Sequence, residues 1–375
     1  METYLRYILN SLILLIIPFA SALILIWVAR KVIARIQDRL GPNSSGSWAG
    51  PYAIFQTLAD AVKILTKELI VPEGADRVVF LAAPAVVVAA ALLVWLVIPF
   101  GPTLQGMDPD IGIFYVVVIT PFTLFSMIMA GWSSRNKYAS LGTFRAVAQI
   151  VSYEIPQFLS LLLPIMLTGS LSLQRLVLAQ QLPFALVLPI PALIYFLAMT
   201  AEVGRLPFEQ AEADAEIVAG YFTEYSGMMF GAFYLAEFIN NFSASLIFAT
   251  LFLGGWRGPW VEQIPALGPV WLVLKGFLVF LVLMLFWGAM PRLRIDHILN
   301  FNWKLLTPLA LAMLIVIAWV NRLAFDLGAT TLAARAPWLL LANLGVGVVT
   351  WGILRHVDRG ARRRRDAQRF EPFLE

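Results

Sequence analysis

The chain contains no cysteine and only two histidines, His297 and His356. Without cysteine it cannot form disulfides, thiolate metal sites or iron–sulfur ligation of its own, and two imidazoles argue against a histidine-rich metal or haem site. It also lacks a Gly-x-Gly-x-x-Gly or Walker-type phosphate loop. The sequence therefore predicts neither a metal site nor nucleotide-driven transport by this chain alone.

Charge is also scarce. Only 13% of the 375 residues are charged, where a soluble domain has about 25%. In contrast, 60% are hydrophobic, many in runs of about 20 residues, the length that crosses a bilayer as a helix. We expect an all-α polytopic membrane protein with one transmembrane domain over residues 1–355. The nine expected spans lie near residues 8–28, 78–100, 112–131, 148–168, 184–203, 229–253, 270–290, 304–322 and 334–354.

Basic residues are concentrated in alternate links between these spans. The rich links carry Arg30, Lys31, Arg35, Arg39, Lys63, Lys67 and Arg77 after the first span, Arg135, Lys137 and Arg145 after the third, and Arg292, Arg294 and Lys304 after the seventh. Cytoplasmic links carry such an excess. We therefore expect the N-terminus outside and a basic tail, residues 356–375, in the cytoplasm, where its arginines at 362–365 favour contact with anionic lipid.

The first long link contains an amphipathic pattern over residues 51–71. Apolar side chains recur at helical spacing on one face, and polar side chains occupy the other. The apolar set is Ile54, Phe55, Leu58, Val62, Leu65 and Leu69, and the polar set is Gln56, Asp60, Lys63 and Lys67. The pattern predicts a helix in the plane of the membrane interface. By itself it favours membrane anchoring over the wall of a ligand site.

Two acids fall inside expected spans. Glu154 follows Gln149 and Tyr153 in the fourth span and precedes Pro156, which predicts a kink, and Glu237 lies in the sixth. A buried acid costs roughly 2.5–3.5 kcal/mol on insertion scales, so such residues usually mark ion pathways. A proton relay is the first interpretation; packing through a pair with an arginine or asparagine is the structural one.

The link between the fifth and sixth spans is unusually acidic. Its carboxylates are Glu202, Glu209, Glu212, Asp214, Glu216 and Glu224, and its one basic residue is Arg205. Crowded like charges favour proton uptake and release near neutral pH. If the segment is helical, several of these side chains share one face; Gly204, Pro207 and Gly220 instead predict a bent, partly irregular segment. A solvated acidic surface over residues 204–228 is the plainer interpretation.

Several blocks together resemble one family. They are Arg30-Lys31, Gln37-Asp38-Arg39-Leu40-Gly41-Pro42-Asn43, Gln56 to Lys63, Lys67-Glu68, Lys137 to Glu154, Glu202 to Ser226, Phe252 to Trp256, and Trp287 to Asp296. The chain resembles the H-subunit (mitochondrial subunit 1 type) of respiratory complex I, the proton-pumping NADH:quinone oxidoreductase. The blocks run from the first span to the eighth, so the resemblance covers nearly the whole chain.

The resemblance implies that the protein lies in the bacterial inner membrane, and it implies a role for each matching residue. Arg30, Asp60 and Lys63 would line the quinone chamber. The acidic path and the mobile coupling loop would comprise Glu154, Glu202, Glu237, Arg205, Glu209, Glu212, Asp214 and Glu216. No residue of the chain would be catalytic by itself. The substrate would be a quinone, either ubiquinone or menaquinone. NADH, FMN and iron–sulfur clusters would belong to partner subunits, which include hydrophilic quinone-site subunits and antiporter-like membrane subunits.

The chain also departs from that family. Ala29 stands where a glutamate is usual, Glu209 and Gln210 replace Asp-Leu after Phe208, and Asp214 replaces a glutamate. Residues 44–48 are additional. The quinone entrance therefore carries less charge than usual.

Three alternatives stay open at this point. A membrane anchor of an energy-converting hydrogenase would share the acidic link, but it would usually lack the amphipathic block. A stand-alone proton-coupled transporter would show internal repeats and interrupted helices at the midplane, which the sequence does not display. The third is a purely structural scaffold.

Overall fold

The computed structural model of the chain describes residues 2–43, 51–102 and 104–370. Side chains are described within these ranges except at 2–9, 214–215, 357–358 and 360–370. The additional residues 44–48 and the side chains of the arginine run 362–365 therefore lie outside the description. All regular structure in the described ranges is helical, which confirms the all-α class.

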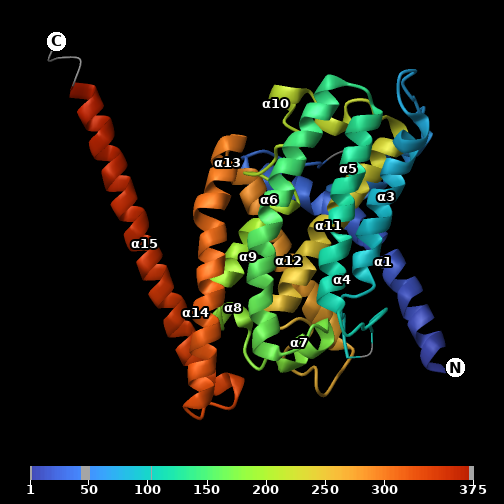
Figure 1. Cartoon of the computed structure of the whole chain (residues 1–375). Coiled ribbons are helices and arrows are strands. Elements are labelled where there is room, and N and C mark those ends of the chain that lie inside the picture. Colours follow the sequence, from blue (N-terminus) through green and yellow to red (C-terminus); the bar gives the residue numbers. More distant parts are fainter. Residues whose placement is uncertain (1, 44–50, 103, 371–375) are drawn as a thin grey trace.

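The helices form a bundle (Figure 1). They are α1 (Glu2–Ile36), η1 (Pro51–Ala53), α2 (Gln56–Thr66), α3 (Arg77–Trp95), α4 (Gly112–Ile119), α5 (Pro121–Ser133), α6 (Lys137–Thr168), α7 (Leu173–Ala179), α8 (Phe184–Val187), α9 (Pro189–Glu202), α10 (Asp214–Ile217), η2 (Gly220–Phe222), α11 (Gly227–Phe252), α12 (Leu267–Ala289), α13 (Ile295–Phe301), η3 (Asn302–Leu306), α14 (Thr307–Asp326) and α15 (Leu332–Phe370).

Eight helical stretches in the described ranges are long and apolar enough to cross a membrane, and α9 is a shorter apolar helix. The expected fifth span, 184–203, is thus divided into α8 and α9. Leu188 separates them with φ −124° and ψ 62°. Proline disfavours helical dihedrals in the residue before it, and Pro189 follows directly. At Pro121 the chain stays helical, because Thr120 keeps φ −57° and ψ −43°, and α4 and α5 form one span.

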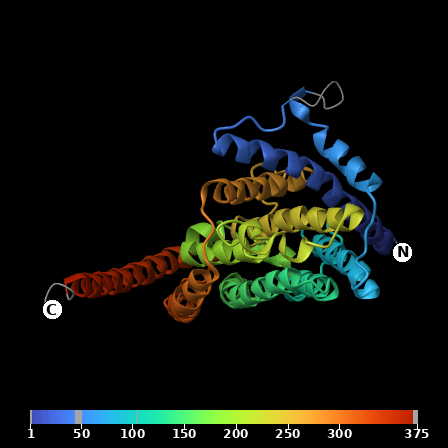
Figure 2. The ribbon, with the colours of Figure 1, turned by 90° about the horizontal axis from the view of Figure 1, so that it is seen from above.

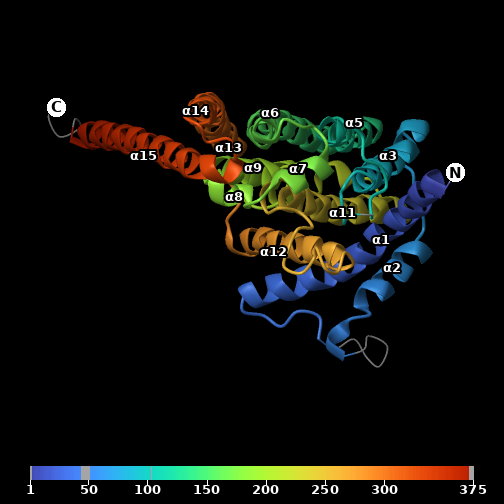
Figure 3. The ribbon, with the colours of Figure 1, turned by 90° about the horizontal axis from the view of Figure 1, so that it is seen from below.

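The helix α11 lies at the centre of the bundle. It is the most enclosed of the candidate spans: 78% of the residues in its 18-residue apolar stretch are buried inside the protein, whereas in α15 only 11% are. Figure 3 shows α11 and α9 between α5, α6 and α14 on one flank and α12 and α1 on the other. Figure 2 shows α15 extending away from the bundle. The spans expected at 148–168 and 334–354 both belong to longer helices, because α6 begins at Lys137 and α15 continues to Phe370.

The links gather at the two ends of the bundle in alternation, as the charge pattern predicted. At the end that we call the basic end, the amide of Asp76 donates to the Ser133 carbonyl oxygen over 3.1 Å and that of Leu293 to Pro207 over 3.2 Å. At the opposite end the Ser172 hydroxyl donates to Asp108 over 2.9 Å. The helix α10 lies at the basic end, and α7 lies at the opposite end (Figure 1).

Candidate functional site

The helix α2 has its amphipathic faces arranged for a membrane. Its apolar side chains point away from the bundle, with Leu58 and Val62 each 53% exposed and Leu65 62% exposed. A soluble protein would bury such a face, so lipid is its expected environment. The polar face lies against α1 and α11, and there the Arg30 guanidinium contacts Asp60 over 2.5 Å. The anchoring helix is therefore also a pocket wall.

This polar face borders a pocket that we call the chamber. It has a volume of about 320 Å³ and contains the three residues predicted for a quinone site. The chamber is lined by Arg30, Asp60, Lys63, Ile64, Lys67, Tyr225, Ser226, Gly227, Phe230 and Tyr234. Gln56 donates its side-chain amide to Asp60 over 3.2 Å and, with Arg30, fixes this carboxylate. A mainly apolar cleft of about 160 Å³ adjoins the chamber and shares Arg30, Asp60, Ile64 and Tyr234 with it.

Arg205 turns inward from the acidic link, toward α11. Its guanidinium pairs with Glu237 of α11 over 2.7 Å and is only 3% exposed. The guanidinium carbon lies 3.9 Å from the centre of the Trp287 ring and 5.1 Å from that of Phe238. Within the described part of the chain, Nε and Nη2 of Arg205 are buried without a hydrogen-bond partner. The charge is thus held by one carboxylate and two aromatic faces.

The link carboxylates are distributed among partners on other elements. The segment 203–226 is mostly irregular, with only α10 and η2 as short helical turns, so its acids do not line one helical face. Arg292 donates to Glu209 over 2.7 Å, Arg145 pairs with Glu216, and the Asn136 amide donates to Glu224 over 2.7 Å. The side chain of Asp214 lies outside the description, although its backbone begins α10.

Glu212 and Tyr221 both belong to this segment, and they lie close together. Burial raises the pKa of the Tyr221 hydroxyl well above its usual value, and the negative charges of Glu212 and Glu237 add to the effect. Tyr221 also lines the cavity that contains Glu237. The acidic link and the intramembrane acids are therefore close enough to interact electrostatically.

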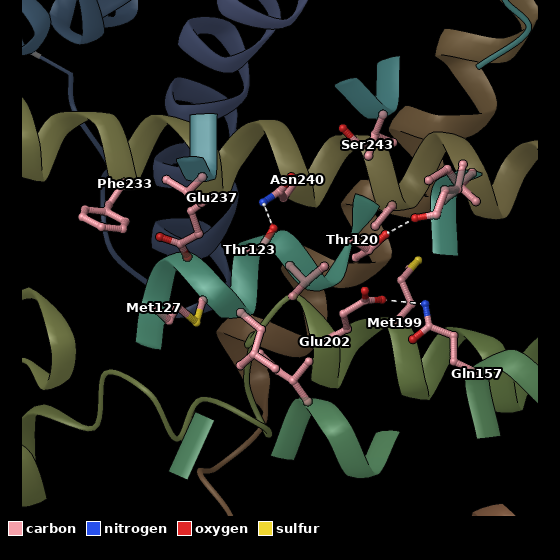
Figure 4. A pocket seen from close by; sticks show the side chains of 18 of the residues that line it. Thr120, Thr123, Met127, Gln157, Met199, Glu202, Phe233, Glu237, Asn240 and Ser243 are labelled. Carbon is pink, nitrogen blue, oxygen red and sulfur yellow. Dashed lines mark hydrogen bonds between the residues drawn. The ribbon is translucent and has the colours of Figure 1, made fainter. Parts of the chain in front are cut away.

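Glu202 and Glu237 line one internal cavity of about 80 Å³ (Figure 4). Its walls also carry polar side chains from α5 and α11, where Asn240 donates to the Thr123 hydroxyl over 3.4 Å. A cavity of this size, mainly apolar but with several polar side chains in its wall, has room for a few water molecules. Carboxylates that share such a cavity can exchange protons through water, which fits the predicted acidic path.

Glu154 lines a second cavity, of about 400 Å³, that also contains Glu202. It does not pair with Arg145, the alternative considered for it, because Arg145 contacts Glu216. Gln149 donates its side-chain amide to the Ala201 carbonyl over 2.6 Å and so ties α6 to α9. The structure thus brings Glu154, Glu202 and Glu237, the acids of the path that the resemblance implies, into two adjoining cavities.

Sequence reasoning missed two kinds of residue here. It assigned no role to Trp287 and Phe238, which flank Arg205, or to Gln157, which donates to Glu202 over 2.5 Å. Gln157 could have been noticed as a polar residue three positions after Glu154, on the same face of a helix. Among the residues that the structure describes, no group of three or more His, Asp or Glu side chains is arranged to hold a metal ion.

Comparisons with known proteins agree over most of the chain. The pattern of the NADH dehydrogenase family matches residues 9–318. The chain belongs to this family. It is 44% identical over 327 residues to the H subunit of the NADH-quinone oxidoreductase of Dehalococcoides mccartyi strain CBDB1, covering 86% of this chain and 90% of that protein.

Two further relatives carry the same name. The H subunit of Carboxydothermus hydrogenoformans is 43% identical over 301 residues, which cover 80% of this chain and 84% of that protein. That of Chlorobaculum tepidum is 42% identical over 311 residues, with 78% and 86% covered. The family match begins in α1 and ends in α14, so the chamber and both cavities lie inside it.

Proposed function

We propose that this chain is the H-type membrane subunit of a complex I-type NADH:quinone oxidoreductase. It would line the quinone chamber and couple quinone reduction to proton translocation. The name shared by its relatives supports this assignment and does not favour the hydrogenase-anchor and transporter alternatives. NADH, FMN and iron–sulfur clusters are assigned to partner subunits, in line with a chain that has no cysteine.

The observation that carries the coupling role is a single turn of α11. Tyr234 lines the chamber and the apolar cleft, and Glu237, three residues later, lines the acid-containing cavity and pairs with Arg205. Residues three apart are neighbours on a helix. A charge change in the chamber therefore occurs one turn away from a buried ion pair, where the low dielectric strengthens its effect.

The chamber and the cleft suit a quinone with a long apolar tail. The charged walls at Arg30, Asp60 and Lys63 are placed to contact a polar head group. The cleft between α1, α2 and α11 includes Leu23, Ile26, Leu65, Met228 and Leu235 and leads toward the lipid-facing side of α2. Reduction of a quinone requires two protons, and the carboxylates nearby respond electrostatically to that demand.

Glu237→Gln in the assembled complex tests this function. Three activities are measured in membrane vesicles: NADH oxidation with a soluble acceptor, quinone reduction and proton uptake. We expect electron transfer to the soluble acceptor to persist, while quinone-linked turnover and proton uptake fall at least about tenfold, as for loss of a positioned proton-transfer group.

Glu262→Gln is the matched control, because Glu262 is an exposed acid at the opposite end of the bundle. It should leave all three activities unchanged. Quinone reduction and proton uptake at wild-type rates in an assembled Glu237→Gln complex would show that α11 has only a structural role.

A further inference from the structure

The two internal cavities meet at a small set of side chains. The residues that line both are Val116, Thr120, Gln157, Tyr195, Glu202 and Ile247. Glu237 lies on one side of this boundary and Glu154 on the other. Glu202 is the one carboxylate among the six. A proton that passes between Glu237 and Glu154 therefore passes Glu202, the one carboxylate that lines both cavities. A residue that hydrogen-bonds Glu202 is in a position to affect this transfer.

Gln157 is that residue. Its side-chain nitrogen donates to the Glu202 carboxylate over 2.5 Å (Figure 4). The side-chain amide is planar, and its NH2 donor group and carbonyl acceptor lie on opposite sides of the Cγ–Cδ bond. It can donate to an ionised carboxylate, or after a half-turn accept from a protonated one. Gln157 is thus able to hydrogen-bond Glu202 in either protonation state.

The carbonyl oxygen of the same amide is not hydrogen-bonded to any residue that the structure describes, although the Tyr195 hydroxyl lies close to the Gln157 side chain. Within the described part of the chain, Oε1 of Gln157 and Oε1 of Glu154 are both buried without a hydrogen-bond partner. The two residues are three positions apart on α6 and line the same cavity. Two neighbouring buried acceptors without a donor are unfavourable. A proton on Glu154 would turn this carboxyl group into a donor on the side of the helix where the Gln157 carbonyl needs one.

We infer that Gln157 links the protonation of Glu154 to that of Glu202, so that the two acids hold one proton between them. In the first state, protonated Glu154 donates to the Gln157 carbonyl, and the amide N–H donates to ionised Glu202. In the second state Glu202 carries the proton, the amide has turned over, and its N–H donates to ionised Glu154. The O–H bond of Glu154 breaks, water in the cavity that both acids line carries the proton, and an O–H bond forms on Glu202, so that no covalent bond of Gln157 breaks. This inference deepens the proposed function and rests on it.

A double-mutant cycle on the assembled complex tests the link. Its variants are Glu154→Gln, Gln157→Met and the pair, and its readout is proton-coupled quinone reduction. Methionine keeps the length of glutamine and removes the amide. We expect each single variant to slow turnover by about tenfold, the value of a hydrogen bond to a charged group. The pair should be no slower than either single variant, because both changes remove the same connection.

Gln180→Met is the matched control. Gln180 also donates its amide to one acceptor, the Thr250 carbonyl, and also has a buried side-chain oxygen without a partner in the described chain, but it lines neither cavity. Its effect should multiply with that of Glu154→Gln. If Gln157→Met fails to assemble, Gln157→Glu repeats the cycle with the shape preserved. An ionised carboxylate has no N–H to offer, so dependence on Glu154 should again disappear.

Independent effects that multiply to about a hundredfold in the Glu154–Gln157 pair would overturn the link. The Glu237→Gln variant separates this result from a failure of the proposed function. If Glu237→Gln remains slow while the Glu154–Gln157 effects multiply, only the link is wrong. If Glu237→Gln turns over at the wild-type rate, the proposed function has failed.

Discussion

At the scale of single residues, Arg205 shows how the protein holds a charge inside the bundle. It pairs with Glu237 over 2.7 Å and lies against the ring of Trp287. Removal of one partner from a buried ion pair leaves an uncompensated charge, which typically costs about 3–5 kcal/mol. We expect Arg205→Met to lower stability by that amount. Arg205→Lys should lose only about 1–2 kcal/mol, because it keeps the charge and weakens the contacts with the rings. Thermal denaturation of the detergent-solubilised complex measures both.

The double variant Arg205→Met with Glu237→Gln is the control for this prediction. It removes both charges and should recover part of the stability lost in Arg205→Met alone. An Arg205→Met complex as stable as the wild type would contradict the argument. So would a double variant whose loss is the sum of the two single losses, because contacting partners should not act independently.

At this scale the sequence indicated which charged residues are functional candidates, but not which residues they contact. Glu154 and Glu237 were identifiable because an acid in an apolar run is rare, and Glu202 because it belongs to an unusually acidic link. Arg205 is the one basic residue of the acidic link, yet it pairs with Glu237 of α11. The backbone of Gly204, at φ 70°, lies in the left-handed region just before it. Such a reversal depends on tertiary packing and leaves no periodic signal in the sequence.

At the scale of elements, Gly231 of α11 allows α2 to pack closely against α11. A Cβ atom built on Gly231 would lie 2.6 Å from Cγ2 of Ile64, a β-branched side chain of α2. We expect Gly231→Ala to displace α2 and to disturb Asp60 and Lys63 in the chamber wall. Quinone reduction should fall by about tenfold, because small displacements at a reacting site have effects of this order or larger. Electron transfer to a soluble acceptor should be unchanged, and comparison of the two activities measures the effect.

Ile64→Ala in the same chain should restore part of the lost quinone reduction, since it removes the atom that Gly231→Ala would meet. Gly345→Ala is the control, because nothing lies within 4 Å of a Cβ atom at that glycine of α15. Equal losses in Gly231→Ala and Gly345→Ala, or no recovery with Ile64→Ala, would contradict close packing between α2 and α11.

Elements differ in how much of them the sequence reveals. The amphipathic pattern at 51–71 predicted a helix there, and α2 spans Gln56–Thr66 of it. Its position in the plane of the membrane interface stays a prediction. The same pattern favoured anchoring over a ligand wall, whereas the polar face lines a pocket. The break between α8 and α9 was also missed. Its signal, Pro189 with Pro191, was present, but apolar composition does not distinguish a continuous span from a divided one.

At the scale of the whole molecule, composition predicted the class, and the positions of basic residues predicted the alternation of links. Neither could predict that α11 is the central helix or that α15 extends away from the bundle (Figure 2). Apolar side chains suit lipid and protein interiors equally well in a membrane. The position of each helix in the bundle therefore depends on side-chain packing rather than on hydropathy.

The absence of cysteine makes the orientation of the molecule directly measurable. A single introduced cysteine is the one thiol of this chain, so a membrane-impermeant maleimide reports its side of the membrane. Glu262 is exposed in the link between α11 and α12, and His356 is exposed on α15. Figure 1 shows α15 running toward the end of the bundle at which α10 and α13 lie. From the excess of basic residues we expect Glu262→Cys to be labelled from outside the cell, and His356→Cys only in inside-out vesicles. Ala249→Cys, at a buried position of α11, should be labelled from neither side. The reverse result would invert the proposed orientation, and labelling of both exposed positions from one side would contradict the alternation of links seen in the fold.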